Sequence, residues 1–88
     1  MNKITEEEKE KIKSFGALGY DNPIMLILLG WDKKDFLAHI SDENSEFNRL
    51  HKKGELEFRY MQDIKLMELA IDGDMKAMEY IEKRKNNM

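Results

Sequence analysis

The 88-residue chain contains no cysteine and no valine, and proline and threonine occur once each. The absence of thiols excludes disulfide bonds, thiolate nucleophiles and cysteine-based zinc sites. Two of the three β-branched residue types are thus nearly absent, while Leu, Met, Glu and Lys are abundant, and straight side chains of this kind lose little rotamer freedom in a helix. The sequence therefore predicts an all-α protein.

Long apolar runs are also missing. The longest, Ile24 to Leu29, is far shorter than the roughly 20 residues that cross a bilayer. The polar start of the chain lacks the apolar core of a secretory signal. We therefore expect a cytoplasmic protein with no membrane partner.

Charge of one sign does not dominate the chain. Charged residues make up 38% and hydrophobic residues 41%, and the net charge is −3. A chain this short buries one small core, so a single domain over 1–88 is expected. A negative net charge gives no general attraction to DNA, so any contact with nucleic acid must come from local basic clusters.

Local signals divide the chain into five helical segments. Thr5 and Glu8 have capping-box spacing, Asn22-Pro23 suits a helix start, and Gly30 suits a helix end. Apolar residues recur at helical spacing in the first and third of these segments. They predict the inward-facing residues Ile12, Phe15 and Leu18 in the first and Phe36, Leu37 and Ile40 in the third. We expect Asp32 to cap the third helix and residues 1–44 to form a three-helix unit.

A long helix is predicted from about Ser45 to Ile71. Apolar residues follow two of its faces, and a chain this small cannot cover both. Asp72-Gly73-Asp74 is a turn signal, so the helix that follows should complete an antiparallel hairpin over 45–88. Self-association is the expected way to cover the remaining apolar face.

The spacing around Gly30 is typical of a helix-turn-helix. Leu26 precedes this glycine by four residues and Phe36 follows it by six, where the two helices must touch. Trp31 would fill the crossing. A helical corner that packs and binds nothing is the alternative, because the segment 32–42 contains three aspartates and two lysines.

Several short motifs, taken in order, resemble the small subunit of bacteriophage terminases. They are Phe15 to Tyr20, the Gly30 turn, His51 to Glu57 with its Lys-Lys-Gly step, and Leu69 to Met78 with its Gly-Asp turn. Their order and spacing match over most of residues 12–84.

The resemblance implies a phage or prophage protein of the bacterial cytoplasm, without catalytic activity. Such a protein binds viral DNA, forms a homo-oligomeric ring and supports packaging by a separate large ATPase-nuclease subunit. By this resemblance, Lys33, Lys34 and His39 lie on the DNA-recognition helix. The oligomer interface would be formed by Phe58, Met61, Ile64 and Met67.

No catalytic or metal-binding constellation is recognisable. His39 and His51 are the only histidines and lack metal-ligand spacing, and the glycines do not form a phosphate-binding loop. We therefore expect no enzyme, cofactor or metal, and interpret Met25, Met61, Met67 and Met78 as core residues. Two other functions remain open: a helical protein-interaction module and a small helix-turn-helix transcriptional regulator.

Overall fold

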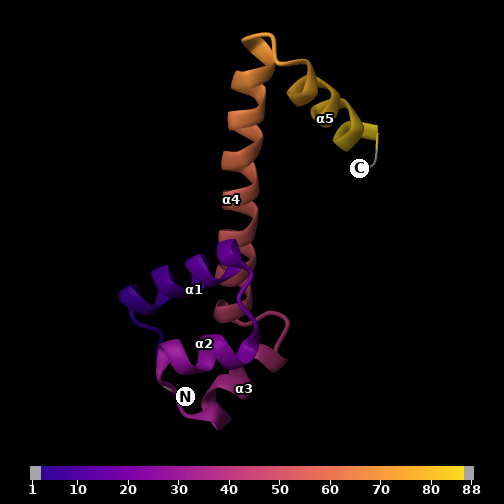
Figure 1. The fold of residues 1–88 in the computed structure, drawn as a ribbon. Coiled ribbons are helices and arrows are strands. Elements are labelled where there is room, and N and C mark those ends of the chain that lie inside the picture. Colours follow the sequence, from indigo (N-terminus) through magenta and orange to yellow (C-terminus); the bar gives the residue numbers. More distant parts are fainter. Residues whose placement is uncertain (1–2, 87–88) are drawn as a thin grey trace. The chain divides into compact units, whose positions relative to one another are not determined.

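Five helices form the computed structural model of this protein, which describes residues 3–86 (Figure 1). They are α1 (Glu6–Leu18), α2 (Asn22–Leu29), α3 (Lys33–Ser41), α4 (Glu46–Ile71) and α5 (Met75–Asn86). No strand occurs within these described residues, so the all-α prediction is confirmed. No helix in the same range is long and apolar enough to span a bilayer.

The chain divides into two compact units. The first covers Met1–Glu57 and the second Phe58–Met88, so α4 contributes its beginning to one and its end to the other. The sequence had placed the division after residue 44. The first unit extends further because Phe47 and Gly54, both on α4, are buried in it.

The helix starts largely follow the sequence signals. The capping box of Thr5 and Glu8 is present at α1, and Gly30 ends α2 with φ of 68°. The cap of α2 is Asp21, one residue before the predicted Asn22, and its carboxylate accepts from the Ile24 amide. Asp32 occupies the cap position of α3 but its side chain makes no capping hydrogen bond.

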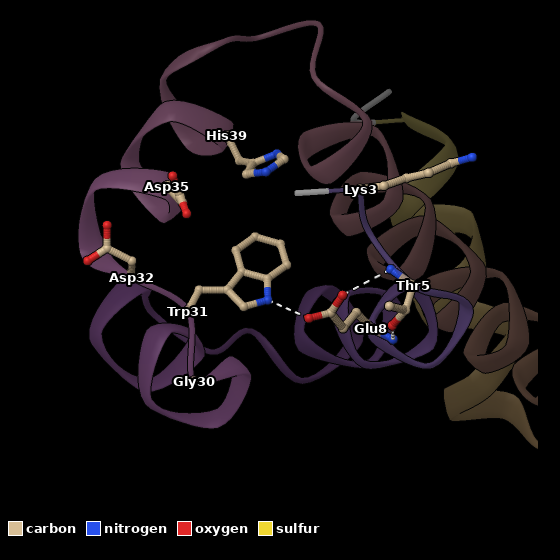
Figure 2. Close-up of a pocket in the computed structure, with 8 residues that line it drawn as sticks. All are labelled: Lys3, Thr5, Glu8, Gly30, Trp31, Asp32, Asp35 and His39. Atoms are coloured by element: carbon tan, nitrogen blue, oxygen red, sulfur yellow. Dashed lines mark hydrogen bonds between the residues drawn. The ribbon is translucent and has the colours of Figure 1, made fainter. Parts of the chain in front are cut away.

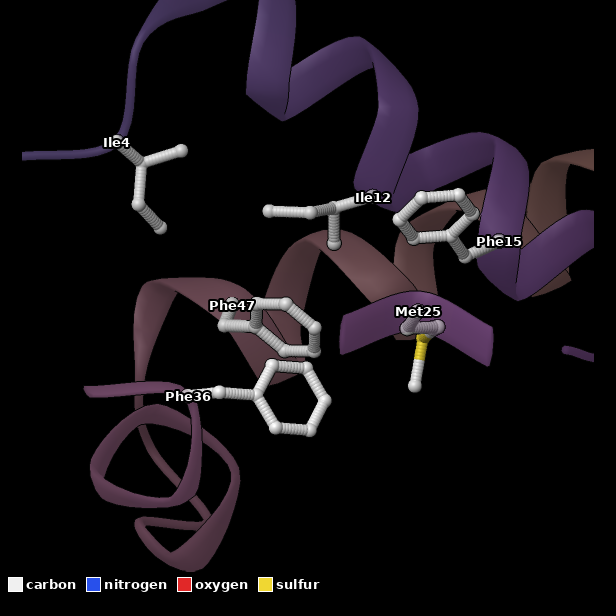
Figure 3. Close-up of a cluster of buried hydrophobic side chains, with 6 residues drawn as sticks. All are labelled: Ile4, Ile12, Phe15, Met25, Phe36 and Phe47. Carbon is white, nitrogen blue, oxygen red and sulfur yellow. The ribbon is translucent and has the colours of Figure 1, made fainter. Parts of the chain in front are cut away.

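One hydrophobic cluster holds the first unit together (Figure 3). Its buried members are Ile4, Ile12, Phe15, Met25, Phe36 and Phe47. Phe47 is the meeting point of the aromatic rings, with Phe36 edge-on at a centroid distance of 5.6 Å and Trp31 at 5.9 Å. Leu18 and Leu37, which the periodicity placed inside, are about half exposed instead.

Two glycines mark the closest approach of α1 and α4. A Cβ on Gly16 would overlap the carbonyl oxygen of His51, and a Cβ on Gly54 would overlap the carbonyl oxygen of Lys13. Both obstacles are backbone atoms, which cannot rotate away as a side chain can. The crossing therefore requires glycine on both helices.

The second unit contains the end of α4, a turn and α5. Gly73 has φ of 96° in the turn, and the Asp74 carboxylate caps α5 by accepting from the Ala77 amide. Arg84 on α5 pairs with Asp63 on α4. This arrangement is compatible with the predicted antiparallel hairpin.

The hairpin leaves most of its apolar side chains uncovered. Ala77 is its one buried residue among those described. Met61, Met67 and Met78, which we interpreted as core residues, are exposed, and Met25 alone of the four is buried. The predicted interface residues Phe58 and Ile64 are exposed as well.

Candidate nucleic-acid interface

The turn between α2 and α3 brings the predicted contact residues into one cluster. The Gly30 amide donates to the Leu26 carbonyl at 3.0 Å, and the positive φ of Gly30 redirects the chain at once. Phe36 is buried, and Leu26 and Trp31 pack against the same cluster. Two short helices that share a core across a glycine turn are compatible with a helix-turn-helix.

Trp31 ties this turn to the start of α1 (Figure 2). Its indole Nε1 donates to Glu8 Oε2 at 2.5 Å, while Glu8 Oε1 accepts from the Thr5 amide at 2.9 Å. One carboxylate thus serves both as helix cap and as partner of the turn. The position of the turn is thereby fixed relative to α1.

Asn48 on α4 holds the other end of α3. Its side-chain amide donates to the Ile40 carbonyl at 3.0 Å and to the Asp42 carbonyl at 2.8 Å. Carbonyl groups at the end of a helix have no partner within the helix, so a side chain that satisfies them fixes where the helix ends. α3 is therefore held at its start by Trp31 and at its end by Asn48.

The outward face of α3 carries no carboxylate. Its exposed residues are Lys33, Lys34, Leu37, Ala38 and Ser41. Two of these are basic and none is acidic. Of the three aspartates in segment 32–42, Asp35 is turned off this face, while Asp32 and Asp42 are exposed at the two ends of the helix.

Asp35 is directed away from that face, into a pocket of about 360 Å³ (Figure 2). The same pocket is lined by Glu8, Trp31 and His39. His39 is half-buried, with its ring centroid 5.0 Å from that of Trp31 and 6.4 Å from that of Phe47. Packing of the α3 helix onto Trp31 therefore separates Asp35 and His39 from the exposed lysines.

The predicted DNA-binding residues consequently fall into two groups. Lys33 and Lys34 lie together on the exposed start of α3, whereas His39 packs among aromatic rings. Sequence reasoning did not identify Glu8 or Asn48 as residues that position α3. The capping-box spacing did identify Glu8 as a helix cap, but no local signal connects it to Trp31, which lies 23 residues away.

Comparisons with known proteins give no relative for this chain: no family model, curated protein or solved structure matches it.

The double role of Glu8 predicts a pH dependence. Hydrogen bonds from the Thr5 backbone amide, and next from Trp31, hold the pKa of Glu8 below its ordinary value of 4.5. Because the folded-state pKa is lowered, the stabilisation is fully present above about pH 4.5 and is lost as the pH falls through the folded-state pKa. We expect Glu8→Gln to flatten the loss of stability on acidification, measured by urea unfolding at a series of pH values.

Glu7→Gln is the matched control. Glu7 neighbours Glu8 in the first turn of α1 but is exposed and makes no side-chain hydrogen bond within the described residues. An equal flattening in both variants would contradict the role given to Glu8, because the effect would then come from charge at the helix start alone.

Proposed function

We propose that this chain is a non-catalytic DNA-binding module of the small-terminase type, which reads DNA with α3 and self-associates through its second unit. The observation that carries the proposal is the outward face of α3. Within α3 its exposed charges are Lys33 and Lys34 alone, with Asp32 and Asp42 at the helix ends, although residues 1–57 carry the whole net charge of −3. Exposed lysines at the start of a helix suit contact with DNA phosphates.

The remaining exposed side chains of α3 fit the same role. Ala38 and Ser41 are small, and Leu37 is apolar. In the major groove, small apolar side chains contact the thymine methyl group and hydroxyl groups bond to base edges. α3 thus offers groups for phosphate contact and groups for base contact on one surface.

Self-association is supported by the exposed apolar residues of the second unit. Phe58, Met61, Ile64 and Met67 are between 37% and 69% exposed. An apolar surface of this kind on a soluble protein marks an interaction site. We propose that these residues lie in or beside contacts between copies of the chain, and that the assembly supports DNA packaging by a separate large subunit.

The test of DNA binding is a charge reversal at the two lysines. In Lys33→Glu with Lys34→Glu we expect weaker binding to duplex fragments from the genome that encodes the chain. A plot of the logarithm of the binding constant against the logarithm of salt concentration should have a slope about two units less steep than that of the wild type. The reason is that binding of the variant releases about two counterions fewer. Fluorescence anisotropy over a salt series measures both quantities.

Lys52→Glu with Lys53→Glu is the matched control. These lysines are also adjacent and exposed, and the change in net charge is identical. Equal losses in the two double variants would show that binding follows net charge and not α3. No binding by the wild type at low salt would refute the DNA-binding part of the proposal.

A protein-interaction module is the second candidate, and one feature of α2 favours it. Ile24, Ile27 and Leu28 are exposed on this helix, which contains no charged residue.

A transcriptional regulator that binds promoter DNA as a dimer would use the same proposed DNA-binding face of α3. Selection of bound fragments from the same genome separates these functions. Recovery of packaging-site or end sequences would favour the terminase type, and recovery of promoter sequences would favour a regulator. Recovery of no fragment would favour a protein-interaction module.

A further inference from the structure

The second unit presents two apolar surfaces on different sides. One is a groove between α4 and α5, of about 520 Å³, lined by Met61, Leu66, Leu69 and Tyr80 with Gln62, Lys65 and Arg84. The other, here called the α4 stripe, is formed by Tyr60, Ile64, Met67 and Ile71, which recur at helical spacing and do not line the groove. Both surfaces lie within Phe58–Met88.

The α4 stripe ends at the most exposed large hydrophobic side chain among the described residues. Ile71 is 80% exposed, and Met75, just beyond the turn, is 67% exposed. Two acidic residues, Asp72 and Asp74, lie between them. The tip of the hairpin is therefore apolar and acidic at once.

The groove has the complementary character. Its floor is apolar, and its two charged lining residues are Lys65 and Arg84. Arg84 pairs with Asp63, whereas Lys65 makes no ion pair with any described residue, and neither does Asp72 at the tip. A cavity of this size accommodates more than one side chain.

The charge of the second unit favours a copy of itself as the occupant. Residues 58–88 contain six basic and six acidic side chains and are neutral overall. The groove between α4 and α5 has an apolar floor, and one of its two cations is already paired with Asp63, so it is not suited to a phosphate backbone. It is suited to a partner with the same mixture of apolar, acidic and basic groups.

We infer that the hairpin tip of one copy, with Ile71 and Met75, docks into the α4–α5 groove of the next copy, where Asp72 meets Lys65. This inference rests on the proposed self-association and specifies its geometry. Each copy carries one tip and one groove. Two copies that exchange tips reciprocally form a two-fold dimer, whereas a contact that continues from copy to copy forms a ring or an open chain.

The first experiment removes the tip side chain. Sedimentation equilibrium of the full chain should show that Ile71→Ser weakens association on the order of 10-fold to 100-fold, as expected for loss of one buried aliphatic side chain. Leu18→Ser is the matched control, because Leu18 on α1 is also an exposed aliphatic residue, at 59%, but lies in the first unit. We expect it to associate like the wild type.

The second experiment exchanges the charges. Asp72→Lys alone and Lys65→Glu alone each place like charges together, and each should weaken association by roughly 5-fold to 10-fold. The double variant restores opposite charges and should associate within about 3-fold of the wild type. Lys11→Glu, an exposed change on α1 in the first unit, serves as the control.

The outcomes separate this inference from the proposed function. The tip-to-groove contact would be overturned if the wild type associates and Ile71→Ser has no effect. It would also be overturned if the charge-exchange double variant associates as weakly as the single variants. In both cases self-association itself would remain supported. A wild type that is monomeric at all concentrations would overturn both. DNA binding by α3 is measured separately and is affected by neither result.

Discussion

Gly54→Ala is expected to destabilise the protein by about 3 kcal/mol, at the upper end of the usual cost of overpacking. The added Cβ would meet the Lys13 carbonyl oxygen on α1, so the helices must separate. If Gly54 were an ordinary helix position, Gly54→Ala would instead stabilise the protein, because alanine is favoured over glycine within a helix by about 1 kcal/mol. Urea unfolding followed by the fluorescence of Trp31, the one tryptophan, measures the change.

Two further variants sharpen this test. Arg49→Ala, at an exposed position of α4 in the same unit, should change the free energy of unfolding by less than about 0.5 kcal/mol. Gly16→Ala should be as costly as Gly54→Ala, and the double variant should cost less than the two together, because one separation of the helices relieves both overlaps. Neutral or stabilising alanine variants would refute the close crossing of α1 and α4.

Phe47→Ala is expected to cost about 3–5 kcal/mol, the usual range for removing a buried phenylalanine ring. Phe47 is 1% exposed and contacts Phe36 and Trp31, so its loss removes the link between α4 and the α2–α3 turn. Domains of this size are stable by only about 5–15 kcal/mol, so this loss is a large fraction of the total. Thermal and urea unfolding should both move to milder conditions, and the proposed DNA binding should fall with the folded fraction.

Phe58→Ala is the matched control, with the same chemical change on the same helix. Phe58 is 42% exposed and lies in the second unit, so the chain at low concentration should lose less than about 1 kcal/mol. Similar losses for the two variants at low concentration would contradict the division of α4 between the two units.

Several elements could be predicted from local sequence because their causes are local. The Thr5–Glu8 box, the αL glycine at Gly30 and the turn before α5 each depend on residues within a few positions of one another. The span of α4 follows from an uninterrupted helical period. Phe36 could be recognised as a core residue for the same reason.

The candidate site could be predicted only in part. Lys33 and Lys34 were expected on an exposed helix and lie there, but His39 shares that helix and packs on Trp31 instead. Which side of a nine-residue helix faces inward depends on what covers it, and here the cover comes from Trp31 and Phe47. Such contacts span distances in sequence over which helical periodicity carries no information.

The amino-acid sequence by itself determined that this protein is helical, where most of its helices begin and end, and that its second half has more apolar surface than it can bury. These properties follow from backbone preferences, capping groups and periodicity, which act over a few residues. Only the tertiary structure decided that α1 and α4 cross at Gly16 and Gly54. It also decided that Glu8 and Asn48 hold α3 in place, and that Asp35 is directed away from the outward face of α3. Each of these depends on atoms that the chain brings together from distant positions, where packing and not local preference determines which groups meet.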